Sequence, residues 1–415
     1  MSEPKLRFKE YEGPWEITIL GEILKERSEI TNDDIPTYSL TIENGVTPKT
    51  DRYEREHLVS DKDSAYKLVM QNDFAFNPMN LRFGAIGKHS EKHPVKVSKY
   101  YNIFYCNPSA NHSFFEAYFR TGKMISFYDK MSTGSLAEKK RVHFSDFLKF
   151  QIPVPTYQEQ TKIADFLTVV DEKITQLTQK FNLLALYKKG VMQKIFNQEL
   201  RFKDDDGREF SEWKTVRFGE IFSFKSTNSY SRECLNYVSG AVKNIHYGDI
   251  HTKFKSRFNI NNERVPFINE NIDLTKLNPD YFCVEGDLVI ADASEDYKDI
   301  GKCIEIESLD NQTVIAGLHT FLARPSLGVL SRGFMSHAMQ SEKIRLQIMT
   351  IAQGTKVLSI STGRLSKIGI PLPEKEEQTK IANFLTAIDD KITQTQAELD
   401  AVKQYKQGLL QQMFV

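Results

Sequence analysis

A long segment of the sequence occurs twice, and this duplication limits the possible folds more than any other feature of the chain. The first copy begins at Ile152 and reads IPVPTYQEQTKIADFLTVVDEKITQ, and the second begins at Ile370 and reads IPLPEKEEQTKIANFLTAIDDKITQ. The copies align without a gap over 152–197 and 370–415, with 22 identities in 46 positions. Chance does not produce this similarity, so we expect two copies of one structural element.

A second, shorter similarity marks the start of each half. The LRFK of Leu6–Lys9 recurs at Leu200–Lys203, and a tryptophan and a Gly-Glu-Ile triplet follow it in both halves, at Trp15 and Trp213. Each half therefore consists of an opening segment, a large domain, a Pro-x-Pro loop and the repeated segment. We expect the parts 1–155, 156–199, 200–373 and 374–415.

The order of these segments predicts a closed, pseudo-twofold arrangement. Leu200–Lys203 follows the first repeated segment directly, whereas the matching segment for the second copy stands at the other end of the chain, as Leu6–Lys9. We therefore expect the N-terminal segment to lie against the end of the second copy and the two copies to run antiparallel. Parallel copies would require one globular domain to span roughly 60 Å, which exceeds what a domain of this size covers comfortably.

The repeated segment has the apolar spacing of a long packed helix. Apolar residues recur in steps of three and four from Ile163 to Ile195, and again from Ile381 to Met413. The first series is interrupted by Lys188 and the second by Thr395 and Lys406. This heptad spacing is typical of helices that pack at a shallow angle in a coiled coil. Thr156 followed by Glu159 also has the spacing of a capping box at the start of the first helix.

The two large domains mix strand-like and helical patterns. Strand-like segments occur at 66–69, 95–105, 287–291 and 301–306, and helical ones at 111–120 and 332–351. Frequent turn residues separate them, so we predict two α+β domains joined by two long antiparallel helices. Beyond short similarities, we find no alignment between the two domains.

Composition excludes several classes of protein. The chain has 40% hydrophobic residues, enough for well-formed cores, but no apolar run of about 18 residues and no signal-peptide pattern. Its four cysteines form no CxxC pair, and its nine histidines show no metal-ligand spacing. We expect no membrane span, no metal site and a cytoplasmic location.

The arrangement of repeats resembles the specificity subunit of a type I restriction-modification system. The resemblance rests on the Pro-x-Pro loops, on EQTKIA at 159–164 and 377–382, and on LRFKDDDGREFSEWKTVRFGEI at 200–221. A further similar segment, YKLVMQNDFAFNPMNLRFGAIG, lies at 66–87 in the first domain. The resemblance covers nearly the whole chain. It implies two target-recognition domains that alternate with two helical spacers, each domain reading one half of a bipartite, asymmetric DNA sequence.

The resemblance also implies partners and cofactors. We expect double-stranded DNA, two modification subunits that methylate adenine, and two ATP-driven translocase-nuclease subunits. S-adenosylmethionine, ATP and magnesium are expected on those partners and not on this chain. Because Lys+Arg and Asp+Glu both number 55, the net charge is zero, and the grip on DNA phosphates requires local basic clusters or help from partners.

Local clusters of basic and small polar residues supply the candidates for DNA contact, although such clusters are often only solvated surface. The first domain offers Arg82, Lys88, His89, Lys92, Lys96, Lys99, Gly134, Ser135, Lys139, Lys140 and Arg141. The second domain offers Lys243, His246, Lys253, Lys255, Arg257, Arg264, Thr355 and Lys356.

Equivalent residues on the two predicted helices supply the candidates for docking two copies of one partner. They are Gln160, Lys162, Lys173, Tyr187 and Lys188 on the first helix and Gln378, Lys380, Lys391, Tyr405 and Lys406 on the second. An alternative is that the seam of these helices is simply core.

Motifs for catalysis are absent or weak. We find no FxGxG, no NPPF or DPPY tetrapeptide and no Walker A loop, and Phe76–Met79 lacks the second proline and the aromatic residue that would hold a flipped base. A loose PD…DxK pattern at Asp280, Asp296 and Lys298 carries little information. We therefore expect a non-catalytic chain. The alternatives are an enzyme with nuclease or methyltransferase chemistry of its own and a helical scaffold without a DNA role.

Overall fold

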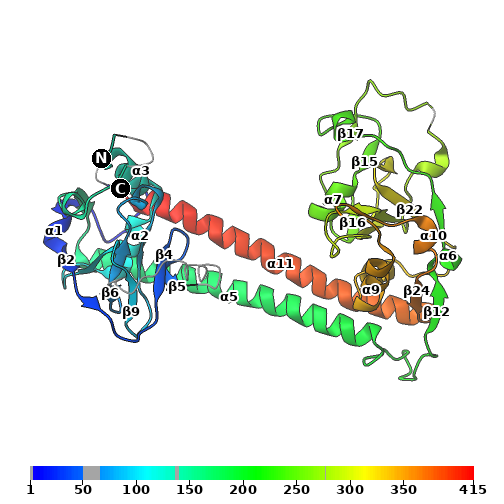
Figure 1. Cartoon of the computed structure of the whole chain (residues 1–415), viewed down its shortest axis with the longest axis horizontal. Coiled ribbons are helices and arrows are strands. Elements are labelled where there is room, and N and C mark those ends of the chain that lie inside the picture. Colours follow the sequence, from blue (N-terminus) through cyan, green and yellow to red (C-terminus); the bar gives the residue numbers. More distant parts are fainter. Residues whose placement is uncertain (1–2, 50–65, 136–139, 276) are drawn as a thin grey trace. The chain divides into compact units, whose positions relative to one another are not determined.

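The computed structural model describes residues 3–49, 66–135, 140–275 and 277–415, and divides the chain into two compact units (Figure 1). Unit 1 comprises Met1–Thr178 and Ala397–Val415, and unit 2 comprises Gln179–Gln396. Two long helices, α5 (Tyr157–Phe196) and α11 (Lys375–Met413), each begin in one unit and end in the other. The units change over at Thr178 and Gln396, which are equivalent positions 218 residues apart, so the boundary itself follows the repeat.

The domain of unit 1 contains small antiparallel sheets and short helices. The four-stranded sheet has the order β2 (Leu24–Arg27), β10 (Asn102–Cys106), β7 (Phe74–Phe76) and β8 (Ile86–Lys88). The smaller sheets are β3 (Ile30–Thr31), β6 (Tyr66–Val69) and β9 (Val95–Ser98), then β4 (Tyr38–Thr41) with β5 (Gly45–Pro48), and β1 (Glu16–Ile19) with β11 (Gln151–Val154). The helices are α1 (Leu20–Ile23), α2 (His112–Phe119), α3 (Gly122–Met131) and α4 (Phe144–Phe147), with the 3-10 turn η2 (Leu81–Phe83).

The domain of unit 2 has larger sheets, which combine parallel and antiparallel pairs. The five-stranded sheet has the order β13 (Phe222–Lys225), β22 (Thr320–Pro325), β18 (Leu288–Ala291), β20 (Cys303–Ser308) and β16 (Arg257–Asn259). The others are β14 (Leu235–Asn236), β17 (Phe267–Ile268), β15 (Lys243–Ile245) and β21 (Val314–Ala316), then β12 (Lys214–Arg217) with β24 (Gly369–Leu372), and β19 (Ala293–Ser294) with β23 (Leu358–Ser359). The helices are α6 (Phe218–Ile221), α7 (Tyr247–Thr252), α8 (Phe334–Ala338), α9 (Glu342–Ile351) and α10 (Thr362–Leu365), and the 3-10 turns are η4 (Arg232–Cys234) and η5 (Pro279–Tyr281).

The long helices are antiparallel within each unit, as the sequence predicts. In unit 1, Asp171 near the start of α5 pairs with Lys406 near the end of α11. In unit 2, Lys188 near the end of α5 pairs with Asp389 near the start of α11, at 2.6 Å. These are equivalent pairs, and they explain why a lysine interrupts the apolar series of each helix: it forms an ion pair beside the seam.

The predicted apolar seam is largely buried and joins the domain cores. In unit 1, Ile163 and Leu167 of α5 belong to the same core as Leu409 and Met413 of α11, together with Trp15. In unit 2, the corresponding core combines residues from the end of α5 and the start of α11 with the domain: Ile195, Phe196, Ile381, Leu385, Phe334 and Ile370. The helix ends are therefore part of the domain cores.

Two segments differ from the sequence prediction in detail. The expected strand at 95–105 is two strands, β9 and β10, joined by a turn at 99–101. The expected helix at 332–351 is two helices, α8 and α9, separated at Ser341, whose hydroxyl donates to the carbonyl of Ala338. Ser341 is the N-cap residue of α9 and has extended backbone angles, and hydrophobic periodicity does not register such a break between two helices.

Candidate nucleic-acid interface

Glu159, the first residue of the EQTKIA motif in the first copy, binds the N-terminal opening segment to α5. Its carboxylate accepts two hydrogen bonds from Arg7, from Nε at 2.8 Å and Nη2 at 2.9 Å, and a third from the indole N–H of Trp15 at 3.3 Å. The pairing raises the pKa of Arg7 above its ordinary value. The predicted capping box is therefore half formed: Thr156 Oγ1 accepts from the backbone N–H of Glu159 at 3.4 Å, while the Glu159 side chain binds Arg7 and Trp15.

The same contact recurs in unit 2 with equivalent residues. Glu377 accepts from Arg201 Nε at 3.0 Å and Nη2 at 2.7 Å, and from the indole of Trp213 at 2.8 Å. Phe8 packs edge-on against Phe166 in unit 1, and Phe202 does so against Phe384 in unit 2. We call this contact the staple: Arg7, Trp15 and Glu159 in unit 1, and Arg201, Trp213 and Glu377 in unit 2.

The glutamine of the motif joins each domain to its helix. Gln160 accepts from the backbone N–H of Asn111 at 2.8 Å and donates to the carbonyl of Pro155 at 2.9 Å. Gln378 accepts from Ser331 at 2.9 Å and donates to Pro373 at 3.0 Å. Both glutamines are buried, at 3% and 1% exposure, which corrects their predicted place on an exposed docking surface.

Four of the predicted docking lysines also have partners within their own unit. Lys162 pairs with Glu10 and lies over the ring of Phe8, and its equivalent Lys380 pairs with Asp205. Lys188 and Lys406 form the ion pairs described above. Lys188 and Lys406 therefore stabilise the helix pair, which corrects the expectation that they point outward to a partner.

The remaining docking candidates are exposed. They are Lys173 and Tyr405 in unit 1 and Lys391 and Tyr187 in unit 2, so each unit presents one lysine and one tyrosine from equivalent positions. Sequence reasoning missed Leu183 and Leu186, which are 65% and 66% exposed beside Tyr187. They lie outside the heptad seam, and an apolar residue off the seam is the signal that could have found them.

In unit 2 the structure gathers cations around one tyrosine. Lys253 donates to the hydroxyl of Tyr237 at 3.1 Å, and Arg264 lies 4.8 Å from the centre of its ring. Arg232 and Lys253 both bind the fully buried carboxylate of Asp249, at 2.6 and 2.8 Å, which fixes their positions. We call Arg232, Tyr237, Lys253 and Arg264 the Tyr237 cluster. Sequence reasoning missed Arg232 and Tyr237, because they lie before the basic stretch at 243–264.

Cations beside a half-exposed aromatic ring suit nucleic acid, since lysine and arginine bind phosphates and aromatic rings contact bases and sugars. The other candidates of this stretch lie elsewhere. Lys243 lies over Phe267, where burial lowers its pKa; Lys255 contacts Thr393 of α11 at 3.4 Å; and Arg257 pairs with Glu307.

His246 is a poor candidate for a DNA contact. It is 6% exposed, caps α7 by accepting from the backbone N–H of Gly248 at 3.2 Å, and has its pKa lowered to about 4, mainly by burial. The imidazole is therefore neutral at physiological pH. This corrects its prediction as a surface contact.

Three DNA-contact candidates of unit 1 bind partners within their own domain. Lys88 binds Glu116 and Ser113, both at 3.1 Å. His89 is fully buried and its Nε2 lies 2.8 Å from the carbonyl of His93. Arg82 lies over Phe83 and 3.6 Å from Asp129. Burial removes Lys88 and His89 from the predicted DNA surface, since a phosphate or base edge cannot reach them.

Three further candidates of unit 1 lie along β9 and the turns that flank it. Lys92 and Lys99 are exposed, Lys99 lies over Tyr100, and Lys96 lies over Tyr66 while its Nζ donates to the carbonyl of Asp33 at 2.7 Å. Tyr100 is itself highly exposed. This edge again places lysines next to aromatic rings, although none of its residues matches the Tyr237 cluster in sequence.

The glycine candidates occupy equivalent loops in the two units. Gly134 and Gly354 both have positive φ, 155° and 127°, and each lies inside a short β-bridged loop, Thr133 to Arg141 in unit 1 and Gln353 to Ser359 in unit 2. A Cβ at Gly354 would meet the carbonyl oxygen of Val357 at 2.0 Å, so the loop requires glycine. Ser135, Arg141, Thr355 and Lys356 are exposed there, Lys140 is half-buried, and Lys139 lies outside the described residues.

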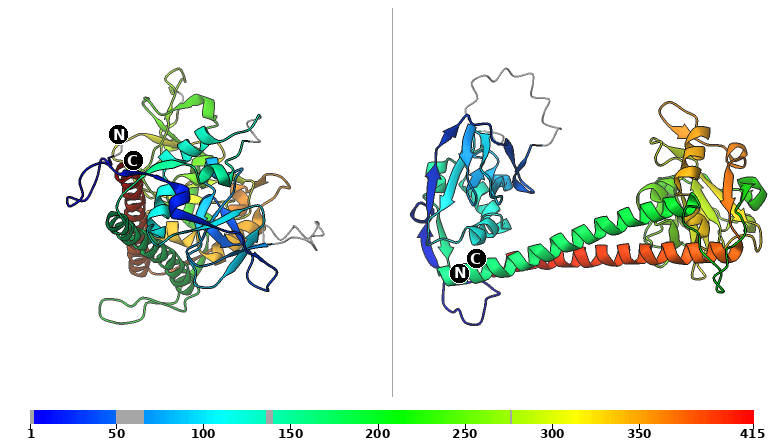
Figure 2. Two further views of the ribbon diagram at one scale, coloured as in Figure 1. Left: turned by 90° about the vertical axis from the view of Figure 1, so that its left-hand side faces the viewer. Right: turned by 90° about the horizontal axis from the view of Figure 1, so that it is seen from below.

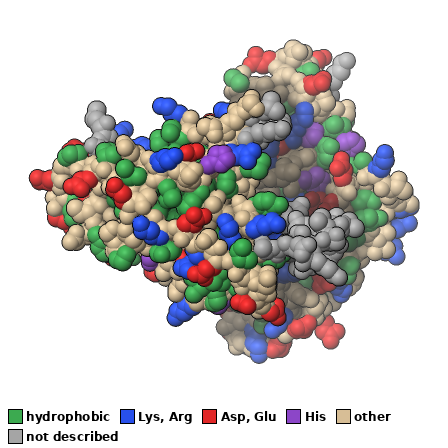
Figure 3. All heavy atoms as spheres, turned by 60° about the vertical axis from the view of Figure 1, so that its left-hand side comes forward, with side chains coloured by type: hydrophobic (Ala, Val, Ile, Leu, Met, Phe, Trp, Pro, Cys, Tyr) green, Lys and Arg blue, Asp and Glu red, His purple; other side chains and the backbone are tan. Residues whose placement is uncertain are grey.

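Charge on the surface is mixed. Figure 3 shows Lys and Arg side chains interspersed with Asp and Glu over the visible face, with no large field of one sign. This agrees with a net charge of zero and means that any phosphate contact depends on local clusters.

The structure assembles no catalytic constellation from the weak PD…DxK pattern. Asp280 lies 3.6 Å from Lys225, and Asp296 accepts from the backbone N–H of Lys298. Over the described part of the chain, His, Cys, Asp and Glu form no group of three suited to a metal ion. The helices within the described ranges include none long and apolar enough to cross a membrane.

Comparisons with known proteins agree on one family. The family model for the type I restriction modification DNA specificity domain matches residues 15–184 and again 210–404. The type I restriction enzyme MjaVIII specificity subunit of Methanocaldococcus jannaschii is 27% identical over 64% of this chain, and the match spans 61% of that protein. A putative MjaX specificity subunit of the same organism is 24% identical over 98% of the chain and 94% of its own length.

Two solved structures share the fold. The S subunit of a type I restriction-modification system from M. genitalium has a TM-score of 0.58 and 15% identity, covering 100% of this chain and 99% of its own. A chain from a structure of type I R-M complex assembly and conformational transition has a TM-score of 0.54 and 17% identity, covering 97% and 99%.

Proposed function

Since the chain belongs to the type I restriction modification DNA specificity family, with one copy of the domain in each half, we propose that it is the sequence-reading subunit of such a system. Each unit reads one half of a bipartite, asymmetric target in double-stranded DNA. The chain performs no chemistry itself: S-adenosylmethionine, ATP and magnesium act on methyltransferase and translocase-nuclease partners.

The observation that carries this proposal is the repeated frame around unrelated domain surfaces. The staple, the Gln160 and Gln378 bridges and the helix pairs recur at equivalent positions, whereas the Tyr237 cluster has no counterpart of the same sequence among the described residues of unit 1. A constant frame with variable surfaces is what a reader of two different half-sites needs. Each good bidentate base contact discriminates by about 1–3 kcal/mol, so a few contacts per unit separate target from background.

The exposed lysine and tyrosine at equivalent helix positions support docking of two copies of a methyltransferase subunit. Tyr405 with Lys173, and Tyr187 with Lys391, give each unit the same pair of side chains. Tyrosine is enriched at protein interfaces because its ring is apolar and its hydroxyl still forms a hydrogen bond. Two like surfaces on one chain fit two like partners.

The test is retardation of a target-bearing duplex by the chain alone and by the chain with its methyltransferase partner. We expect weak, salt-sensitive binding by the chain alone and tight, sequence-specific binding by the complex, because the chain has no net positive charge. Tight specific binding by the isolated chain would contradict the partner dependence. Incubating the isolated chain with DNA, magnesium and S-adenosylmethionine tests the alternative of its own chemistry: cleaved or methylated DNA would establish an enzyme.

A further inference from the structure

The repeat extends into the domains at α2–α3 and α8–α9. Thr121 and Ser341 each precede a ten-residue helix and donate to the carbonyl three residues earlier, at 2.8 and 2.6 Å. Asn111 and Ser331 make the same bond to the motif glutamines. Thr121 and Ser341 are 220 residues apart, as are Asn111 and Ser331, and the same offset makes Ala117 of α2 the counterpart of His337 in α8.

In unit 2 this position is filled by an imidazole. His337 is fully buried, its Nε2 lies 3.5 Å from Thr386 Oγ1, and its Nδ1 lies 3.9 Å from a carboxylate oxygen of Asp389. The lowered pKa of His337, about 3, arises mainly from burial and keeps the ring neutral.

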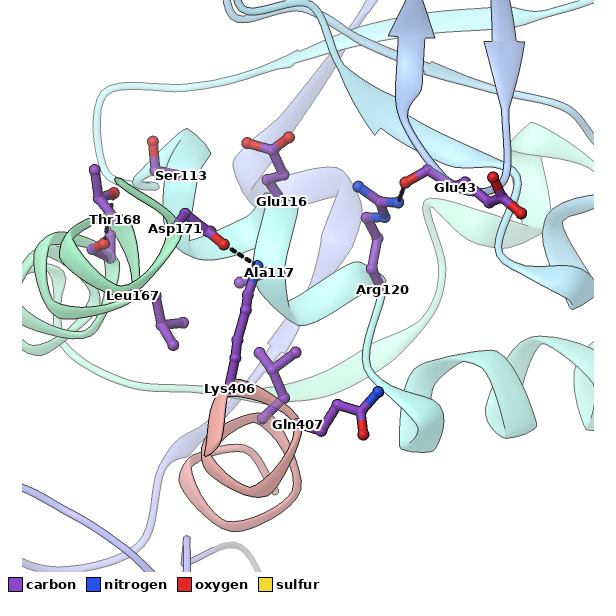
Figure 4. Close-up of a pocket in the computed structure, with 12 residues that line it drawn as sticks. Glu43, Ser113, Glu116, Ala117, Arg120, Leu167, Thr168, Asp171, Lys406 and Gln407 are labelled. Atoms are coloured by element: carbon purple, nitrogen blue, oxygen red, sulfur yellow. Dashed lines mark hydrogen bonds and ion pairs between the residues drawn. The ribbon is translucent and has the colours of Figure 1, made fainter. Parts of the chain in front are cut away.

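In unit 1 the same position opens into a pocket of about 420 Å³ (Figure 4). Ala117 replaces the imidazole, and the counterparts of Thr386 and Asp389, which are Thr168 and Asp171, line the pocket. Glu116 of α2 and Arg120, the residue directly after α2, also line the pocket. Lys406 and Gln407 line it from α11. This volume is in the range of small-ligand sites, roughly 300–1,000 Å³.

The groups that face the pocket have spare acceptor oxygens. Thr168 donates its hydroxyl proton to the carbonyl of Ala164 at 2.8 Å, so its oxygen can only accept there. Lys406 binds Oδ1 of Asp171, and Lys88 binds Oε2 of Glu116, which leaves one oxygen of each carboxylate. Arg120 is turned to the carbonyls of Ile42 and Glu43. The complementary ligand therefore carries several N–H donors.

We propose that this pocket binds an arginine guanidinium carried by a polypeptide docked where α5 begins and α11 ends. Guanidinium is planar, presents five N–H donors and pairs with carboxylates in a bidentate manner. The inference rests on the proposed function, in which a methyltransferase subunit docks on this part of the helices. Unit 2 supplies its own planar nitrogen group, His337, and needs no ligand at the equivalent place.

The test uses N-acetyl-L-argininamide as the probe and the full chain in isothermal titration. We expect the wild type to bind about one equivalent. Ala117→His should weaken binding tenfold or more by filling the pocket, and Glu116→Gln should weaken it by removing a carboxylate. His337→Ala is the matched control in unit 2: it opens the equivalent space, but Ser336 stands at the position of Glu116, so the stoichiometry should stay at about one equivalent. If Ala117→His does not fold, Glu116→Gln still tests the pocket, because it also should bind the probe more weakly than the wild type.

Addition of the methyltransferase subunit should displace the probe from the wild-type chain. Absence of probe binding, or equal binding by wild type and Ala117→His, would overturn the pocket assignment even where the methyltransferase docks normally. Probe binding that follows the predicted variants but persists in the complex would overturn the partner as the source. A methyltransferase that does not bind the chain at all would instead overturn the proposed function.

Discussion

The backbone N–H of Leu6 donates to the carbonyl oxygen of Gln412 at 2.9 Å, and this bond joins the N-terminal segment to the end of α11 (Figure 2). Its equivalent in unit 2 is the bond from Leu200 to Lys194, at 3.2 Å. Lys194 and Gln412 are 218 residues apart, as the repeat requires. The predicted contact between the opening segment and the second helix is therefore confirmed, and unit 1 is assembled from both ends of the chain.

A circular permutant should fold and keep its specificity. We would join Val415 to Met1 through a short Gly-Ser linker and open the chain between Gln198 and Glu199, the position equivalent to the present ends. Every staple contact survives this rearrangement, because each is made within one unit. Circular dichroism and the methylated motif in the complex measure the result. A folded permutant that methylates a different motif, or an unfolded one, would contradict the closed repeat.

Glu159→Gln should loosen unit 1, and Glu377→Gln should loosen unit 2. Each variant weakens the hydrogen bonds that a charged arginine donates to a buried carboxylate, which costs about 1.5–3 kcal/mol. Amide hydrogen exchange should therefore accelerate around the opening segment of the affected unit and leave the other unit unchanged. Glu172→Gln, an exposed residue of α5, is the control and should change stability by less than about 0.5 kcal/mol. Equal exchange in both units for either staple variant would argue against two independent staples.

Lengthening both helices should lengthen the non-specific spacer of the DNA target. Four residues inserted after Thr178 add roughly 6 Å of helix and keep the seam nearly in phase. Because α11 is antiparallel to α5, a matched insertion after Gln396, the equivalent position, is required to preserve the Lys188–Asp389 and Lys406–Asp171 pairs. We expect both half-sites to be unchanged. An active double insertion with the original spacer would show that the helices do not set the distance.

His337 should make unit 2 sensitive to acid. The pKa of His337 in the folded chain, about 3, lies below the ordinary value of 6.5. Between these two pH values the imidazole is protonated in the unfolded chain but neutral in the folded chain. The contribution of His337 to the free energy of unfolding is thus fully present above about pH 6.5 and is lost as the pH drops toward 3. His337→Gln should flatten this part of the urea-stability curve. The Glu305 carboxyl, whose pKa burial raises to about 7, acts in the opposite direction but is present in both proteins. Equal slopes in the variant and the wild type would contradict this role.

Periodicity and repetition were sufficient to predict the large features of the fold. The heptads gave the two long helices within a few residues, and the position of Leu6–Lys9 gave the closure at Gln412. The equivalence of α2–α3 with α8–α9 was missed, because it is held by capping hydroxyls and backbone bonds that different side chains provide equally well.

The candidate site could be predicted only in part. The density of basic residues predicted Lys253 and Arg264 as DNA contacts. It did not predict their partner Tyr237, which is distant in sequence and is brought next to them by folding. It also selected Lys88 and His89, which are buried, because a sequence does not show which basic residue meets an internal carboxylate or carbonyl. Gln160 and Gln378 were predicted at the surface for the same reason. A glutamine that recurs because it bonds within each unit cannot be distinguished, in sequence alone, from one that recurs because it binds a partner.

Exchange of one domain tests the central claim, that each unit reads one half-site, most directly. Residues 14–150 would be replaced by the corresponding domain of another family member, with Arg7, Glu159 and the helices kept. The methylated adenines would then be mapped across a genome that expresses the chimera with its methyltransferase. We predict that one half of the motif changes while the other half and the spacer stay the same. A change in both halves, or in neither, would contradict the account.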